Sequence, residues 1–191
     1  MAERLRAAAA GHGFSADEIE GLLRAHGRAM EPRRRGVPDE HDFRYLHPGR
    51  TALVLLEDGG WADPLDAMAA ALVESEDGEL AVERASIGRV LGEEVAGRVD
   101  AVPVPAGVRD GAELLEALVT APRGAQLVAL AERLDHLRHL HVRVRRWGDR
   151  EGAGRSARQA RDIYLPLARR VGGTLERRFD WWCRRVGRRW E

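Results

Sequence analysis

The densest group of chemically reactive side chains in this sequence lies in one stretch, residues 126–141. Within eight residues it carries two acidic side chains, two arginines and two histidines: Glu132, Arg133, Asp135, His136, Arg138 and His139. Apolar residues recur beside them every three or four positions, which predicts a helix with a broad buried stripe at Leu127, Leu130, Leu134, Leu137 and Leu140. Ionisable groups next to such a stripe form either a solvated face or the wall of a site, and a solvated face is the commoner outcome.

Histidine and cysteine do not by themselves indicate a zinc site here. The spacing of His136, His139 and His141 does not repeat one helical face, so we expect His139 and His141 at the surface. The single cysteine, Cys183, excludes an internal disulfide and a cysteine-rich zinc site.

The totals describe a soluble globular protein. A length of 191 residues suits one domain with a substantial core, and 44% hydrophobic with 32% charged residues is not the composition of a disordered chain. The net charge of zero gives no global attraction to nucleic acid or to an anionic membrane. No stretch resembles a signal peptide or a transmembrane span, so we expect a cytoplasmic protein without membrane contact.

The elements that must position the reactive residues are all predicted to be helices. Ser15 and Glu18 have capping-box spacing ahead of an apolar helix, and Pro64 suits the first turn of another. Residues 86–102 keep helical register as one helix, with Ser86 as its cap, and Asp110 can cap the next. Residues 31–43 and 146–154 are rich in Gly, Pro or charge and are expected to be loops, whereas Pro166 should kink or reset its helix. No alternating pattern indicates a strand, so the fold class is all-α.

Several fragments follow one another in an order that resembles the HD-domain hydrolase module of the RelA/SpoT family, which includes small stand-alone alarmone hydrolases. They are RRRGVP (33–38), YLHP (45–48), AALVES (70–75), VLGEEVAGRVDAV (90–102), LAERLDHLRHL (130–140) and IYLPLARRVGGTLERRFDWWCRR (163–185). The resemblance covers about residues 17–185. It implies an HD-domain-like bundle of about eight helices, with residues 1–191 as a single domain.

The resemblance also implies a chemistry: metal-assisted removal of pyrophosphate from the 3′ position of (p)ppGpp. Members of the family hold a divalent ion, typically manganese, with the histidine of the HP motif, a His-Asp pair and the aspartate of an ADR motif. Carried over, these positions give His47, Glu74 with Ser75, and Glu132, so that one imidazole and one carboxylate of the pair are absent. The expected metal ligands are therefore His47, Glu74, Glu132 and Asp135, with His136 as the alternative to Asp135, because both share the helical face of Glu132.

Other site positions follow from the same resemblance. Glu76 and Asp77 stand for the two carboxylates that position and deprotonate the attacking water. The expected substrate contacts are Arg34, Arg35, Arg133 and Tyr164. The lysine that the family carries after the helix at residues 90–102 is replaced in this chain by Val104.

Three functions remain open from the sequence. The first is a degenerate (p)ppGpp pyrophosphohydrolase-like protein with little or no turnover that binds a guanine nucleotide or a partner, without a cofactor. The alternative is an active phosphohydrolase with a remodelled site for manganese or another divalent metal. A third is nucleic-acid binding by the C-terminal helix, where arginines interleave with Trp181, Trp182 and Trp190. Given the zero net charge, the preferred reading of that helix is inward tryptophans and solvated arginines, with a homo-oligomer contact at Trp190 also open.

Overall fold

The computed structural model describes residues 1–190 except 38, 40–41, 76–77 and 105–110. Its described residues form helices and no strand, which confirms the all-α class. There are more helices than the eight expected, in this order: α1 (Ala2–Gly11), α2 (Ala16–Gly36), α3 (His47–Leu53), a π-helical turn η1 (Val54–Asp58), α4 (Pro64–Leu72), η2 (Gly78–Leu80), α5 (Arg84–Leu91), α6 (Glu93–Asp100), α7 (Gly111–Thr120), α8 (Arg123–Trp147), α9 (Arg150–Gln159), a π-helical turn η4 (Ala160–Tyr164), α10 (Leu165–Val171), α11 (Gly173–Arg185) and η5 (Gly187–Arg189).

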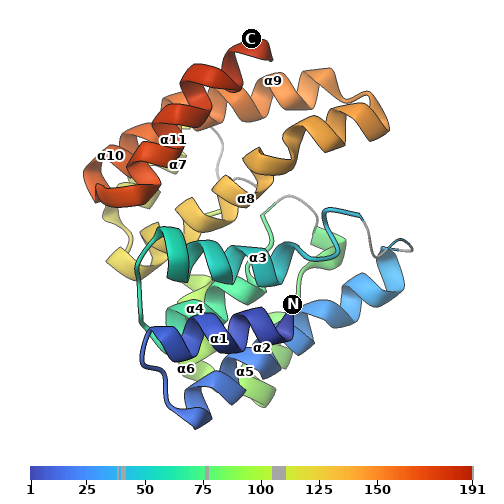
Figure 1. The fold of residues 1–191 in the computed structure, drawn as a ribbon, viewed down its shortest axis with the longest axis vertical. Coiled ribbons are helices and arrows are strands. Elements are labelled where there is room, and N and C mark those ends of the chain that lie inside the picture. Colours follow the sequence, from blue (N-terminus) through green and yellow to red (C-terminus); the bar gives the residue numbers. More distant parts are fainter. Residues whose placement is uncertain (38, 40–41, 76–77, 105–110, 191) are drawn as a thin grey trace.

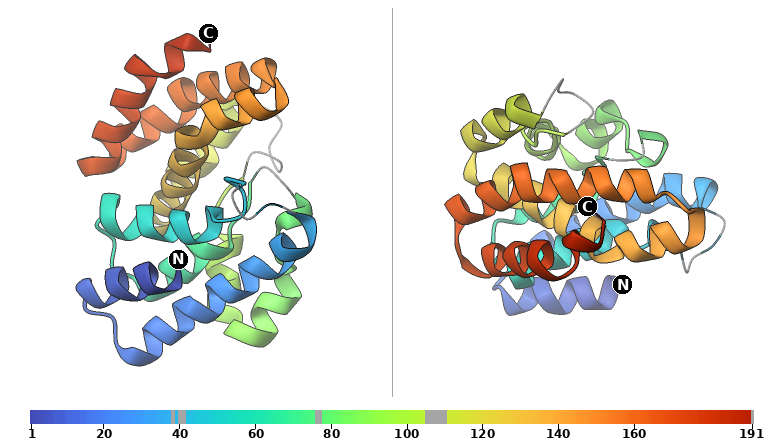
Figure 2. Two further views of the ribbon diagram at one scale, coloured as in Figure 1. Left: turned by 45° about the vertical axis from the view of Figure 1, so that its right-hand side comes forward. Right: turned by 90° about the horizontal axis from the view of Figure 1, so that it is seen from above.

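Helix α8 runs through the middle of the molecule and connects two groups of helices (Figure 1). On one side it packs against α3, η1 and α4, and on the other against α9, α10 and α11. Figure 2 shows the same arrangement from two further directions, with α10 and α11 side by side in the outermost layer. Every residue from Gly124 to Asp135 is buried, so this half of α8 has no solvated face. Glu132, Arg133 and Asp135 therefore lie in the interior, against the default expectation for charged helical residues.

Three predictions that depend on local sequence patterns are confirmed. Ser15 accepts a hydrogen bond from the Glu18 backbone and Glu18 returns one, which completes the predicted capping box of α2. Pro64 occupies the first turn of α4, behind an Asp63 cap. A π-helical turn stands directly before Pro166, which confirms that the proline resets the backbone there.

Three predicted boundaries are wrong. Residues 31–36 are not loop, because α2 continues through Pro32 to Gly36, where the buried side chain of Arg33 anchors its last turn. Residues 86–102 are not one helix, because Gly92 takes a φ of 98° and separates α5 from α6, and α5 begins before Ser86. The loop expected at 146–154 is reduced to a short connection at Gly148 and Asp149. Asp110 lies outside the described residues.

Apolar side chains from both groups of helices meet on α8 and form one continuous core. The apolar face of α11, Leu175, Phe179 and Trp182, is buried against it, and Trp182 Nε1 donates to the carbonyl oxygen of Leu137 at 3.0 Å. The prediction of inward tryptophans thus holds for Trp182 but is wrong for Trp181, which is exposed. In the part of the chain that the structure describes, no helix has both the length and the apolar character needed to span a bilayer.

Candidate metal centre and adjoining pocket

Four side chains from three segments converge beside α8. His47 opens α3, Glu74 follows the end of α4, and Glu132 and His136 lie one turn apart on α8. One nitrogen or oxygen atom from each lies within 4.8 Å of the others. Their side chains are 1%, 3%, 3% and 9% exposed, respectively. We call these four residues the His/Glu cluster.

The imidazole of His47 is held from behind by α8. Its Nδ1 lies 2.7 Å from Oδ2 of Asp135. The same carboxylate accepts two hydrogen bonds from Arg50, one from Nε to Oδ1 at 2.8 Å and one from Nη2 to Oδ2 at 3.0 Å. Burial alone would raise the pKa of Asp135, but these hydrogen bonds and charges hold that pKa well below its usual range. The carboxylate is therefore an acceptor for Nδ1–H, and the lone pair of Nε2 is left facing the cluster.

Nε2 of His47 is the donor atom that most clearly favours a metal site. It is buried without a hydrogen bond in the described residues, and the nearest cluster oxygen, Oε1 of Glu132, lies 3.9 Å away. A carboxylate that orients a histidine from its far nitrogen is the usual support of a metal-binding imidazole. Asp135 lies on the far side of the His47 ring, and it is not one of the four residues of the cluster.

Glu74 is fixed by an arginine from α2. The guanidinium of Arg33 donates to Oε2 of Glu74 at 2.5 Å and to the backbone oxygens of Ala29, Arg44 and Leu80 at 3.0–3.1 Å. The second carboxylate oxygen, Oε1, lies 3.9 Å from Nε2 of His136. One oxygen is therefore committed to the scaffold while the other faces the cluster.

The carboxylate of Glu132 lies close to both histidines of the cluster. Its Oε1 accepts a hydrogen bond from the Ser75 hydroxyl and lies 2.9 Å from Nε2 of His136. Burial raises the pKa of Glu132, but His136 first, then Arg133 and His47, outweigh it and hold that pKa well below its usual range. The carboxylate is thus ionised and within reach of both imidazoles.

This donor set fits a divalent transition-metal ion. Two imidazoles and two carboxylates suit manganese, iron or zinc, and Nε2 of His47, which has no hydrogen-bond partner among the described residues, is a donor atom available to an ion. His136 belongs to the cluster instead of Asp135, although the sequence favoured Asp135. The two are adjacent on α8, so their side chains point about 100° apart around the helix axis.

A cavity of about 220 Å³ opens next to the cluster. Its walls are Phe43, Arg44, His47, Glu74, His136, Arg143, Trp147 and Asp149. The rings of Phe43 and Trp147 lie 5.5 Å apart, and the guanidinium of Arg44 lies 4.7 Å from the Trp147 ring centre. Aromatic and guanidinium groups beside the His/Glu cluster suit a phosphorylated aromatic molecule such as a nucleotide.

The arginines of this pocket already have acidic partners. Arg44 pairs with Asp42 at 3.2 Å, and Arg143 pairs with Asp149 at 3.0 Å. A phosphate that entered the pocket would therefore compete with two carboxylates.

The predicted substrate contacts do not gather in this pocket. Arg34 and Arg35 are exposed at the end of α2, where Arg35 lines a separate cavity with Glu79 and Leu80. Arg133 and Tyr164 are buried together, with the guanidinium 5.0 Å from the ring centre and Nη2 of Arg133 3.4 Å from Ser75 Oγ. They lie behind the cluster and not in the pocket.

Glu76 and Asp77, the predicted catalytic carboxylates, lie outside the described residues. Sequence reasoning missed Phe43, Arg143 and Trp147, which come from segments about a hundred positions apart. Nothing in their spacing joins those segments. The sequence already indicates His136 as the alternative to Asp135, because four residues after Glu132 is one helical turn.

Comparison with solved structures identifies the architecture. A metazoan ortholog of SpoT that hydrolyses ppGpp and plays a role in starvation responses superposes with a TM-score of 0.63 over 91% of this chain and 97% of the other, at 22% sequence identity. The chain has the fold of a SpoT-type HD-domain hydrolase. No family model and no curated protein sequence matches it. The SpoT-type fold confirms the architecture that the ordered fragments implied, while the His/Glu cluster stands where that resemblance placed a metal.

Proposed function

We propose that this chain is a divalent-metal-dependent phosphohydrolase that acts on a guanosine polyphosphate such as ppGpp through a remodelled metal site. The observation that carries the proposal is the convergence of His47, Glu74, Glu132 and His136, with one donor atom from each within 4.8 Å of the others. The solved structure with the same fold is a ppGpp hydrolase, which supports the substrate class.

The proposed site has two imidazoles, the same number as the site that the RelA/SpoT resemblance implies. The RelA/SpoT resemblance places a His-Asp pair where this chain has Glu74 and Ser75, so an imidazole is lost at the end of α4. His136 on α8 supplies a second imidazole from the opposite wall, one turn from Glu132. The resulting set of two nitrogen and two carboxylate donors remains suitable for manganese or a similar divalent ion.

The ion would supply a Lewis acid that polarises a phosphoryl group and activates water. The chain's own residues hold the donors in place. Arg33 fixes one oxygen of Glu74, and Asp135 with Arg50 fixes the ring of His47. Such supports reduce the reorganisation that binding an ion would require.

The neighbouring cavity supports a nucleotide as substrate. We assign its aromatic wall, Phe43 and Trp147, to the base and its arginines, Arg44 and Arg143, to the phosphates. Arginine binds phosphate oxygens in pairs through its planar fork. Asp42 and Asp149 hold these side chains ready until the anion replaces them.

A second candidate is a protein that binds the nucleotide without hydrolysing it. The observation that favours this function is Ser75, which stands where the resemblance places a metal-binding aspartate and donates its hydroxyl to Glu132. A hydroxyl is a weaker ligand than a carboxylate, so the ion would have one strong ligand fewer.

The deciding experiment begins with manganese binding to chelator-stripped protein, measured by calorimetry. We expect binding that is lost in His47→Ala and retained in His141→Ala, since His141 is exposed on the same helix. Hydrolysis is then followed as release of pyrophosphate from ppGpp in the presence of manganese. Metal and nucleotide binding without pyrophosphate release would select the second candidate, and absence of metal binding would refute the metal centre.

A further inference from the structure

The zero net charge of the chain conceals a strong separation of charge. From Arg150 to Trp190 there are twelve arginines and only four acidic residues. The preceding 149 residues have the opposite balance, with 26 acidic residues and 19 arginines. This C-terminal segment, which comprises α9, η4, α10, α11 and η5, is therefore a cationic layer on a more acidic body.

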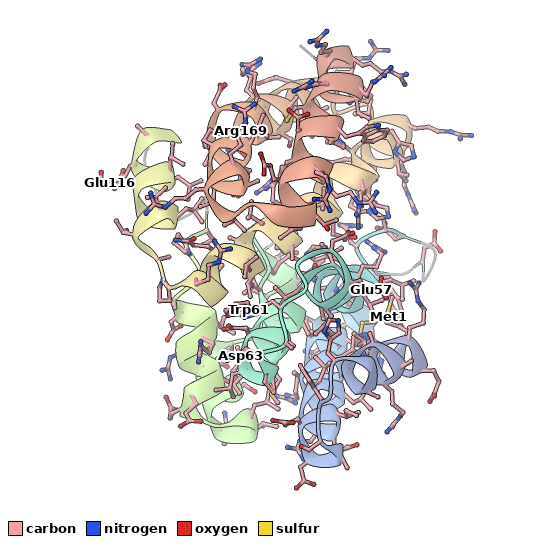
Figure 3. All side chains as sticks on the ribbon, turned by 60° about the vertical axis from the view of Figure 1, so that its left-hand side comes forward. Met1, Glu57, Trp61, Asp63, Glu116 and Arg169 are labelled. Atoms are coloured by element: carbon pink, nitrogen blue, oxygen red, sulfur yellow. The ribbon has the colours of Figure 1, made fainter. Side chains whose placement is uncertain are left out.

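All twelve arginines of this layer are exposed. Figure 3 shows side chains with nitrogen tips projecting from this end of the molecule, with Arg169 labelled among them. Five of the twelve form ion pairs: Arg155, Arg161, Arg169, Arg178 and Arg184. For Arg170, Arg185, Arg188 and Arg189 the described residues provide no acidic partner. The layer therefore presents uncompensated positive charge to solvent.

An exposed tryptophan lies within this charge. Trp181 is 58% exposed, the highest value among the large apolar side chains of the described residues. It lines a cavity of about 430 Å³ together with Thr174, Arg177 and Arg178, which share its helical face. Arg184 and Arg185 follow Trp181 by three and four residues on the same helix, and Arg188 is exposed in the next turn, η5. We call Arg177, Trp181, Arg185 and Arg188 the Arg/Trp stripe.

The helix that carries the stripe is anchored in the core, and the turn after it packs against α9. Leu175, Phe179 and Trp182, on the other face of α11, are buried. The backbone of η5 approaches α9 so closely that a Cβ at Gly154 would lie 3.1 Å from the Trp190 carbonyl oxygen. Helix α9, with its exposed arginines, therefore packs against the turn that carries Arg188 and Arg189.

We propose that the Arg/Trp stripe binds single-stranded nucleic acid. Its arginines match the charge of a phosphate backbone, and Trp181 offers a flat surface on which an unpaired base can stack. A membrane surface fits less well, because the apolar face that an interfacial helix would insert is already buried in the core. A protein interface would require a larger apolar centre than one exposed tryptophan.

The test measures binding of a 5′-fluorescein-labelled 15-nucleotide poly-U RNA to the whole chain by fluorescence anisotropy at several salt concentrations. If the three arginines of the stripe contact phosphates, log K should fall with log salt at a slope of about −2, given about −0.7 per phosphate for single strands. Trp181→Ala should weaken binding about tenfold. Arg185→Ala/Arg188→Ala should make the slope less steep by about 1.

The matched control is Arg6→Ala/Arg24→Ala, which removes two exposed arginines from α1 and α2 and should leave binding unchanged. Because Trp181 and the stripe arginines are exposed, their variants should keep the helical circular dichroism of the parent. The proposal is overturned if the parent does not bind the RNA at low salt, or if the stripe variants bind it as tightly as the control. Equal or tighter binding of phosphatidylserine vesicles would also overturn it and assign the surface to lipid. None of these outcomes depends on the metal centre.

Discussion

Asp135→Asn is the substitution that best tests how the cluster is built. Asp135 is 2% exposed and accepts three hydrogen bonds, one from His47 and two from Arg50. Both of its oxygens face N–H donors. An asparagine has the same shape, but in either orientation of its amide the NH₂ group faces an N–H donor. At least one buried N–H group is therefore left without an acceptor.

The size of the effect follows from those contacts. An unsatisfied buried donor costs about 1–3 kcal/mol, and loss of one partner of a buried ion pair costs about 3–5 kcal/mol. Arg50 remains 20% exposed, so water recovers part of its charge. We expect the metal-free variant to lose about 2–4 kcal/mol of unfolding free energy, measured by urea denaturation.

Manganese affinity should fall as well, by about 10–100-fold, because His47 loses the group that orients its ring. The matched control is Asp58→Asn, which removes the same charge from a carboxylate that binds Arg138 and Arg178 away from the cluster. It should leave manganese affinity unchanged. The reasoning fails if Asp135→Asn binds manganese as tightly as the parent does, even if it is less stable.

Three further substitutions test other parts of the structure. Burial first, then the N-terminal charge and nearby arginines, lower the pKa of His26 from 6.5 to about 4. The stability that the neutral form of His26 contributes is complete above pH 6.5 and is lost as the pH falls toward 4. The parent should therefore lose up to about 2 kcal/mol more unfolding free energy than His26→Leu when the pH is lowered from 7 to 4.5, measured by urea titration at each pH. Gly124→Ala would place a Cβ 1.8 Å from Oδ2 of Asp66, so it should cost about 2 kcal/mol or more in thermal unfolding, whereas Gly11→Ala, with open space around it, should be tolerated. Ser75→Asp should destabilise the metal-free protein through repulsion with the neighbouring carboxylate and raise manganese affinity in calorimetry; unchanged affinity would place residue 75 outside the site.

The sequence predicted those parts of the fold that depend on local chemistry. The capping box at Ser15, the proline that opens α4 and the backbone reset before Pro166 all follow from interactions within a few residues. The predictions failed where distant contacts decide the outcome. Pro32 indicates the end of a helix, but α2 continues because Arg33 reaches Glu74 and Leu80, more than forty positions away.

The candidate site shows the same division between local and distant information. Periodicity alone leaves Asp135 and His136 equivalent, because both lie within one turn of Glu132. The choice is made by α3: its His47 and Arg50 turn toward Asp135, and the adjacent His136 faces Glu74 instead. Asp135 thus lies behind His47, while its neighbour His136 is part of the cluster. Glu74, just after the end of α4, stands where the RelA/SpoT resemblance places a histidine, and His136 on α8 is the second imidazole of the cluster. Sequence spacing leaves the choice between Asp135 and His136 open, and the packing of α3 against α8 decides which of the two side chains faces His47 from behind and which joins Glu74 and Glu132.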